Sequence, residues 1–320
     1  MRKLLLVLLF AGCGGALAQE FPSHPVKLVV TFTAGGGADT TARVFADRLS
    51  EAWKHQVVVE NKPGGGGTIG AQDVYKAAPD GHTLLLASNT NVINQVVVPN
   101  LSFDIRDFVP IAVATSGPMV IAVNGSKVPA KDLKEFIAML KAAPGKYSYA
   151  SCNVASAHHF AMEILKNIEG IDALHIPHKG CGPAVTDAVA GHIDIAVITL
   201  PAAVPFFKQG RLRPIALMSE TRSAAAPEIP TVRDSGIPEL RDFSLDNYYG
   251  FMAPPGTPHA IAAKIEADVL RIAANPDIRK KLEGAGMDML PLDSAAMIKL
   301  VRADYEKYFK AAKALNIRGE

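Results

Sequence analysis

The sequence predicts an α/β protein with two lobes, each built on a mostly parallel sheet covered by helices. In the first third of the chain, three short apolar strands each lead into a loop and a helix, which is the pattern of a parallel sheet. A second strand–loop–helix series follows a long apolar stretch. The chain then returns through another apolar stretch to a helical tail, as expected when it leaves one lobe, builds a second and comes back.

The strands of the first lobe are predicted at residues 26–30, 57–59 and 84–86. A helix follows the first strand, because apolar residues recur there at helical spacing after Asp39, which we expect to be the N-cap. The residues of this buried helical face are Ala42, Phe45, Leu49 and Trp53.

Four consecutive glycines at residues 64–67 form the most distinctive local pattern. They separate the second strand from a helix whose expected N-cap is Thr68. Glycine allows the backbone to approach a ligand closely, and free N–H groups at the start of a helix suit an anion. Since open α/β sheets bind ligands beyond the carboxyl ends of their strands, the sequence predicts an anion site among the loops that follow the strands.

A long apolar stretch at residues 109–123 is predicted to cross between the lobes, and residues 248–252 are predicted to cross back. Between them, Ser156 is the expected N-cap of a helix that runs to Gly170. The strands of the second lobe are predicted at residues 147–151, 174–176, 193–198 and 214–218. Helices that open at residues 257–258 and 275–276 are predicted for the tail. A last helix there is marked by an apolar stripe of Met297, Val301, Tyr305, Tyr308 and Ala312.

The first 18 residues have the pattern of an export signal. Arg2 and Lys3 precede an apolar core at residues 4–10, and residues 16–18 form an A-x-A cleavage site. We therefore expect a soluble periplasmic protein cleaved near Ala18, with a form lipid-anchored at Cys13 as the alternative. Cleavage removes two basic residues and no acidic one, so the formal net charge falls from +2 to 0. A neutral protein has no electrostatic basis for binding nucleic acid or an anionic membrane.

The same features predict the domain boundaries: a signal peptide at residues 1–18, a first lobe at 19–120 plus 250–320, and a second lobe at 121–249. Nucleotide binding is not supported, because Gly35-Gly36-Gly37 is not G-x-G-x-x-G and no G-x-x-x-x-G-K-[ST] occurs. No G-x-S-x-G motif lies near His158 and His159. The sequence thus predicts neither an enzyme nor a bound cofactor.

Short motifs, in order along the chain, resemble those of the Bug-type receptors, which are the extracytoplasmic solute receptors of tripartite tricarboxylate transporters. The motifs are PVKLVV at 25–30 with GGG at 35–37, ENKPG at 60–64 with IGA at 69–71, APDGHTL at 78–84, YAS at 149–151, KG at 179–180 with PAVTD at 183–187, IPTV at 229–232 with SG at 235–236, and APPGTP at 253–258. Each motif is short, but their order and their extent over the chain make the resemblance specific.

The resemblance implies a type II periplasmic binding protein, in which two α/β lobes joined by crossing strands hold a ligand between them. It implies a monomeric receptor that captures a dicarboxylate, tricarboxylate or aromatic acid for the membrane permease subunits of a tripartite transporter. The carboxylate would be held by backbone N–H groups and hydroxyls. Carried over to this chain, the ligand-binding residues are Thr33, Ala34, Gly35, Gly36, Gly37, Ser88, Asn89 and Thr90 in the first lobe and Ser151, Asn153, Ser156, Lys179, Gly180 and Thr199 in the second.

At some positions this chain departs from the family pattern. Thr199 stands where an aspartate is common, which favours a fully anionic ligand over an amino acid because no carboxylate remains to bind an ammonium group. Four further residues follow the ends of second-lobe strands and are metal-ligand types: Cys152, His158, His178 and Cys181. They allow three interpretations, namely a zinc site, a Cys152–Cys181 disulfide favoured by an oxidising compartment, or two inert thiols. A ligand sensor for signalling and a metal-binding protein remain alternative functions.

Overall fold

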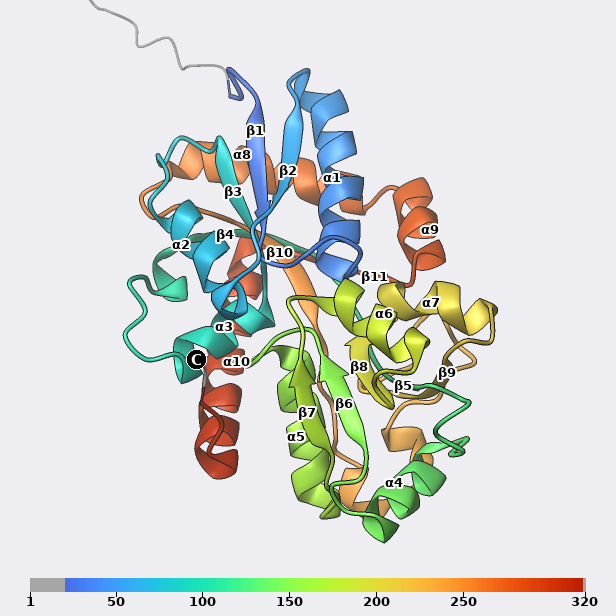
Figure 1. Ribbon diagram of the computed structural model, residues 1–320. Helices are drawn as coiled ribbons and strands as arrows, with labels where there is room; N and C mark the ends of the chain where they lie inside the picture. The colour runs from blue at the N-terminus through green and yellow to red at the C-terminus, as the bar shows by residue number, and fades with distance from the viewer. Residues whose placement is uncertain (1–20, 319–320) are drawn as a thin grey trace, which may run out of the picture.

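The computed structural model describes residues 21–318, so the export signal, its cleavage site and Cys13 lie outside the described residues. Two α/β lobes lie one above the other, and the chain passes between them (Figure 1). Within residues 21–318, no helix combines the length and the apolar character that a membrane span needs.

A six-stranded sheet with the order β11–β4–β10–β3–β1–β2 forms the centre of the first lobe. Strands β1, β2 and β3 pair in parallel, whereas β10 pairs antiparallel with β3 and β4, and β11 pairs antiparallel with β4. The strands are β1 (Val26–Val30), β2 (Val57–Asn61), β3 (Thr83–Ser88), β4 (Val109–Ser116), β10 (Tyr248–Ala253) and β11 (Asp288–Leu292).

Helices cover both faces of this sheet. Alternate residues of β1 enter different apolar clusters: Leu28 belongs to the cluster that contains residues of α1, α8 and α9, and Val29 to the cluster that contains residues of α2, α3 and α10. Trp53 is buried at the end of α1, as its helical spacing predicts. The helices are α1 (Gly37–Trp53), α2 (Thr68–Tyr75), α3 (Asn89–Val97), α8 (His259–Ala273), α9 (Pro276–Gly284) and α10 (Ser294–Leu315), with short 3₁₀ turns η1 (Gly65–Gly67) and η2 (Ile105–Asp107).

The second lobe contains a five-stranded sheet with the order β7–β6–β8–β5–β9. Its strands are β5 (Met119–Val123), β6 (Ser148–Ser151), β7 (Leu174–Pro177), β8 (Ile195–Thr199) and β9 (Arg213–Leu217). Its helices are α4 (Leu133–Ala142), α5 (Ala157–Glu169), α6 (Cys181–Ala190) and α7 (Leu200–Lys208), with 3₁₀ turns η3 (Arg233–Ser235) and η4 (Pro238–Leu240).

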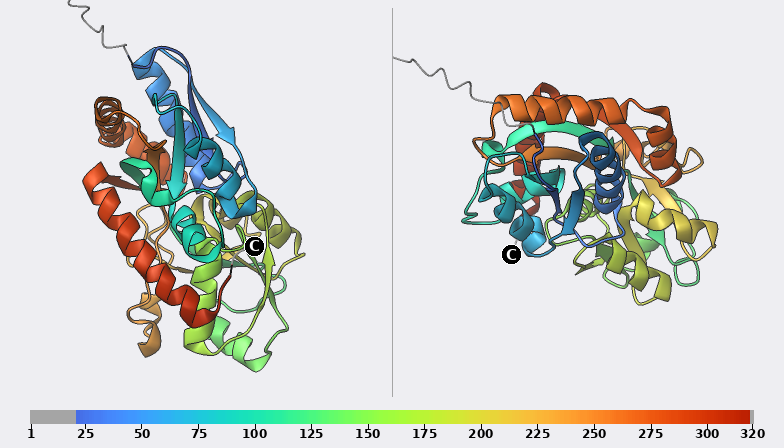
Figure 2. Two further views of the ribbon diagram at one scale, coloured as in Figure 1. Left: turned by 90° about the vertical axis from the view of Figure 1, so that its left-hand side faces the viewer. Right: turned by 90° about the horizontal axis from the view of Figure 1, so that it is seen from above.

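The two lobes also share a core. Tyr308 and Ala312 of α10 and Ile93 and Val97 of α3 are buried in a cluster made mostly of second-lobe residues. In Figure 2, α10 runs from the first lobe down along the second. The C-terminal helix therefore joins the lobes in addition to the two crossing segments.

The predicted two-lobed α/β fold is confirmed, but both sheets are mixed rather than mostly parallel. The reason is that a chain that crosses between lobes and returns brings its crossing strands into antiparallel pairs. Strand β11 was not predicted, because Pro291 argues against a central strand; β11 lies at the edge of its sheet, where proline is tolerated.

Two predicted helix starts need correction, whereas Ser156 caps α5 as predicted by accepting a hydrogen bond from the His159 N–H. Gly67, not Thr68, is the N-cap of α2, and the Thr68 hydroxyl donates to the Gly65 carbonyl instead. Gly36, not Asp39, is the N-cap of α1.

Candidate functional site

Loops that follow strands of the two lobes contact each other across the lobe boundary. The Gly37 N–H at the start of α1 donates to Thr199 Oγ1 at the end of β8, over 3.3 Å. The Ala157 N–H at the start of α5 donates to Thr90 Oγ1 in α3, also over 3.3 Å. The structure therefore has its lobes in contact at this boundary.

The first-lobe loop (residues 32–36) joins β1 to α1 and is held by Asp39. The Asp39 carboxylate accepts hydrogen bonds from the Gly35 N–H at 3.2 Å, Arg43 Nε at 3.0 Å and Asn61 Nδ2 at 3.1 Å. Asn61 Nδ2 also donates to the Phe32 carbonyl. Burial acts to raise the pKa of Asp39, but hydrogen bonds from Arg43, Gly35 and Asn61 outweigh it, so the pKa lies below its ordinary value. Asp39 thus braces the loop as an anion.

Glycines let the loops of the two lobes approach closely. A Cβ at Gly180 would overlap Thr33 Oγ1, and one at Gly182 would lie 2.8 Å from the Ala34 carbonyl oxygen. Gly36 faces Cys181, whose Cβ would be 3.6 Å from a Cβ at position 36. Of the residues predicted to bind ligand, the structure brings Thr33, Ala34, Gly36 and Gly37 together with Gly180 and Thr199.

Other residues that were predicted to bind ligand make hydrogen bonds within their own lobe or to the chain that enters β10. The Gly35 N–H is bonded to Asp39, and the Ser88 N–H donates to Asn91 Oδ1. Asn89 Nδ2 donates to the Asp246 carbonyl at 2.8 Å and to the Tyr308 hydroxyl at 3.0 Å, so this side chain fixes the chain leading into β10.

The second-lobe loop (residues 152–156) is shaped by two buried serines. The hydroxyls of Ser151 and Ser156 both donate to the Asn153 carbonyl at 2.9 Å. Ser151 Oγ also lies 2.7 Å from His175 Nε2. These hydroxyl protons are used within the lobe, whereas the side-chain Nδ2 of Asn153 is buried and has no hydrogen-bond partner within the described residues.

Several buried polar atoms near the boundary have no hydrogen-bond partner within residues 21–318. They include Thr33 Oγ1, Asn94 Oδ1 and Asn153 Nδ2, as well as Thr31 Oγ1 beside Gly67. Leaving such a group unpaired costs about 1–3 kcal/mol, and folded proteins pair nearly all of them. The lobe boundary therefore offers unpaired hydrogen-bonding groups to a polar ligand.

A cavity of about 220 Å³ opens at this boundary. Its walls include the glycines at 64–66 and Asn94 from the first lobe, and Asn153 and Lys179 from the second. This volume lies below the range of about 300–1,000 Å³ typical of sites for drug-sized ligands, so it suits a small one. Lys179 is exposed and makes no ion pair within the described part of the chain.

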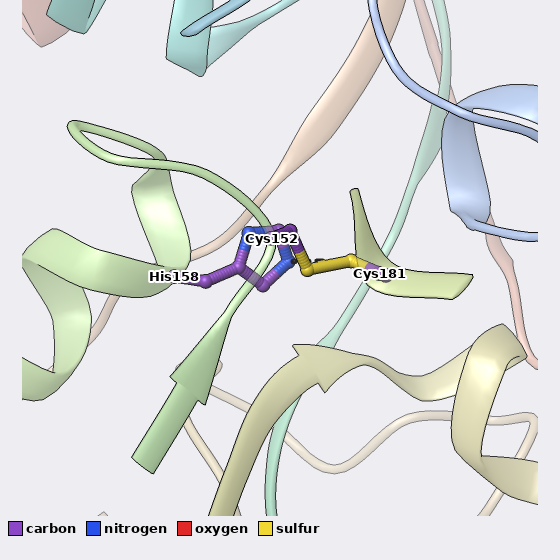
Figure 3. Close-up of side chains that lie close together, drawn as sticks. All are labelled: Cys152, His158 and Cys181. Carbon is purple, nitrogen blue, oxygen red and sulfur yellow. Dashed lines mark hydrogen bonds between the residues drawn. A yellow bond between two sulfur atoms is a disulfide. The ribbon is translucent and has the colours of Figure 1, made fainter. Parts of the chain in front are cut away.

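Cys152 and Cys181 form a disulfide, which settles one of the three alternatives left open by the sequence. The bond ties the second-lobe loop to the first residue of α6, and His158 Nε2 lies 3.8 Å from Cys181 Sγ (Figure 3). His178 is not with them, because its ring nitrogens lie 3.0 Å from the Ile176 carbonyl and 2.8 Å from Asp187 Oδ2. Burial lowers the pKa of His158 to about 3, so its imidazole is neutral at physiological pH.

The sequence did not indicate Asn94 as a site residue. The glycines at 64–66 were expected to suit an anion, but they were not among the predicted ligand-binding residues. A signal for Asn94 exists, because Asn91 and Asn94 interrupt the buried face of α3 at a helical spacing of three. Pairing of α3 with the glycine loop, through Asn94 Nδ2 and the Gly66 carbonyl, is a tertiary contact that spacing alone does not give.

Comparisons with known proteins agree with this architecture. Residues 41–317 match the family described as "Tripartite tricarboxylate transporter family receptor". The UPF0065 protein in the tcbD-tcbE intergenic region of Pseudomonas sp. (strain P51) is 32% identical over 294 residues, covering 91% of this chain and 86% of that protein.

Two solved structures are similar over nearly their whole length. R. palustris Rpa4515 with adipate has a TM-score of 0.89 and 28% identity, covering 93% of this chain and 99% of that chain. MatC from Rhodopseudomonas palustris with bound malate has a TM-score of 0.84 and 28% identity, covering 91% and 99%.

Proposed function

Because the chain belongs to the tripartite tricarboxylate transporter receptor family, we propose that it captures a small dicarboxylate between its lobes and delivers it to the membrane subunits of such a transporter. The family consists of solute-binding receptors, not enzymes. Residues 1–18 direct the chain to the periplasm, and residues 19–120 plus 250–320 close against residues 121–249 around the ligand.

The observation that carries this proposal is the set of buried polar atoms at the lobe boundary that have no hydrogen-bond partner within residues 21–318. Thr33 Oγ1 and Asn153 Nδ2 come from opposite lobes, and both can donate to a carboxylate. A ligand that bonds to both is held fully only when the lobes are closed, so binding favours closure.

The local electrostatics favour an anion although the mature chain has no net charge. Five helices begin at the lobe boundary, namely α1, α3, α5, α6 and α7. The N-terminus of a helix carries a partial positive charge and unpaired N–H groups, which attract carboxylates. Thr199 places a neutral hydroxyl at the boundary, so an anion meets no opposing carboxylate from this position.

Calorimetric titration of the protein with L-malate, adipate and L-aspartate tests the proposal. We expect one dicarboxylate to bind one-to-one and to raise the melting temperature, because a ligand that binds only the folded state stabilises it. L-Aspartate should bind more weakly, since no carboxylate remains at position 199 for its ammonium group. Absence of heat and of any thermal shift for a panel of organic acids at millimolar concentration would refute the proposal.

A variant localises the site. Asn153→Leu should weaken binding by roughly 10–100-fold, because a hydrogen bond to a charged group contributes about 1.5–3 kcal/mol. Asn167→Leu is the matched control, since Asn167 is exposed on α5 away from the boundary. Equal affinities of the two variants would place the ligand elsewhere.

A further inference from the structure

Three side chains of metal-ligand type converge in the second lobe. One potential ligand atom each of Cys152, His158 and Cys181 lies within 4.8 Å of the others (Figure 3). All three residues are buried, with exposed fractions of 0%, 2% and 6%. They belong to three separate segments: the loop after β6, the first turn of α5 and the first residue of α6.

Neither hydrogen bonding nor helix capping explains why a histidine is buried at position 158. Its Nδ1 is buried and has no hydrogen-bond partner within residues 21–318, while its Nε2 faces Cys181 Sγ at 3.8 Å. Ser156 already caps α5, so His158 is not needed to end the helix. An apolar side chain would fill the same space without an unpaired polar nitrogen. A buried imidazole beside two sulfur atoms could act as a metal ligand.

We propose that reduction of the Cys152–Cys181 disulfide converts this cluster into a binding site for a thiophilic metal ion, for which zinc(II) is the best-fitting candidate. Two thiolates and one imidazole are a known protein ligand set for zinc with a fourth position open. As long as the disulfide is intact, its sulfur atoms are not thiolates and the site does not bind the ion.

The chemistry balances with a dithiol as reductant. The dithiol supplies two electrons and two protons, the S–S bond breaks, Cys152 and Cys181 become thiols, and the dithiol becomes a disulfide. Binding of the ion then releases the two thiol protons to solvent. The two sulfur atoms and His158 Nε2 form the bonds to the ion.

Other histidines of the chain do not belong to this proposed metal site. His178 is engaged by Asp187 and by the Ile176 carbonyl, so it does not complete the site. A second cluster, His24, Asp80 and His82, lies elsewhere in the first lobe and contains no sulfur. Binding there would not depend on the redox state, and this difference separates the two clusters experimentally.

Cobalt(II) titration of the reduced and the oxidised protein tests the proposal. All variants are made in the mature chain from residue 19, in which Cys152 and Cys181 are the only cysteines. They also carry His24→Ala, which removes the second cluster. We expect the reduced protein to bind one cobalt ion with thiolate-to-cobalt charge-transfer absorption in the near ultraviolet, and zinc to displace it. The oxidised protein should show no such band.

His158→Phe keeps the volume of the side chain and removes its nitrogen, and His192→Phe is the control at an exposed position. His158→Phe should weaken zinc binding by more than the roughly 10–100-fold that follows loss of an outer partner of a metal ligand, whereas His192→Phe should not change it. Absence of the charge-transfer band in the reduced protein, or an unchanged zinc affinity in His158→Phe, overturns the proposal. Circular dichroism of each reduced variant verifies that it remains folded.

Discussion

The two lobes hold their boundary loops by different chemistry. In the first lobe, the loop at residues 32–36 is fixed by hydrogen bonds and an ion pair that converge on Asp39. In the second lobe, the loop at residues 152–156 is fixed by a covalent bond between Cys152 and Cys181. Both loops follow strands and face the same boundary, so the difference shows that one geometric task can be met by a pH-dependent brace or by a redox-dependent one.

Removing the disulfide should have the largest effect. Its cysteines are 29 residues apart in the sequence, and for a loop of this length the loss of the cross-link costs about 3–4 kcal/mol of unfolding free energy in the chain-entropy account. Urea denaturation of a Cys152→Ser/Cys181→Ser variant of the mature chain measures the loss, and the unsubstituted mature chain is the reference. An unchanged urea midpoint in the double variant would show that the covalent brace is not needed.

Removing the charged brace should cost less. Asp39→Asn keeps the size of the side chain but removes the charge that accepts bonds from Gly35, Arg43 and Asn61, so we expect a loss of about 1–3 kcal/mol in the free energy of unfolding. Arg43→Gln should cost less than that, because the Arg43 side chain is 54% exposed and exposed ion pairs contribute little. The reverse order of the two variants in urea denaturation would contradict the role of Asp39.

Acid should weaken only the first-lobe brace. The pKa of Asp39 in the folded protein is lower than its ordinary value of 3.8, so its contribution to stability is present above that value and is lost as the pH falls through the folded pKa. The difference in unfolding free energy between wild type and Asp39→Asn should therefore stay constant from pH 6 to pH 4 and shrink over the range below 3.8. A difference that stays constant over this range would show that the charge of Asp39 is not the stabilising feature.

Gly180→Ala should change stability less than removal of the disulfide does, and it should open the contact between the lobes. Gly180 has φ +150°, and a Cβ there would overlap Thr33 Oγ1 of the other lobe. Gly210 also has a positive φ, +67°, but a Cβ there would meet nothing within 4 Å. Both variants should lose about 1 kcal/mol or slightly more through backbone strain, whereas only Gly180→Ala should increase the radius of gyration in X-ray scattering. Equal scattering curves would mean that the boundary contact does not hold the lobes closed.

Apolar spacing was sufficient to predict most strands and helices, because core residues such as Leu28 and Trp53 repeat with the period of their element. Helix starts were less predictable: Asp39 and Thr68 have N-cap chemistry, yet glycines take that position and the two side chains bond to the preceding loops. The roles of Asn94 and Asn153 depend on contacts between distant segments. Its place after a strand end also grouped His178 with the cysteines, whereas Asp187, nine residues further on, engages it instead.

The central claim is that polar groups of both boundary loops hold one small dicarboxylate. Hydrogen exchange of the backbone amides, measured with and without saturating L-malate or adipate, tests it most directly. The account predicts slower exchange at residues 32–37 and at residues 152–158 together, in the presence of the same ligand. Binding that slows exchange in one lobe only, or at neither loop, would contradict it.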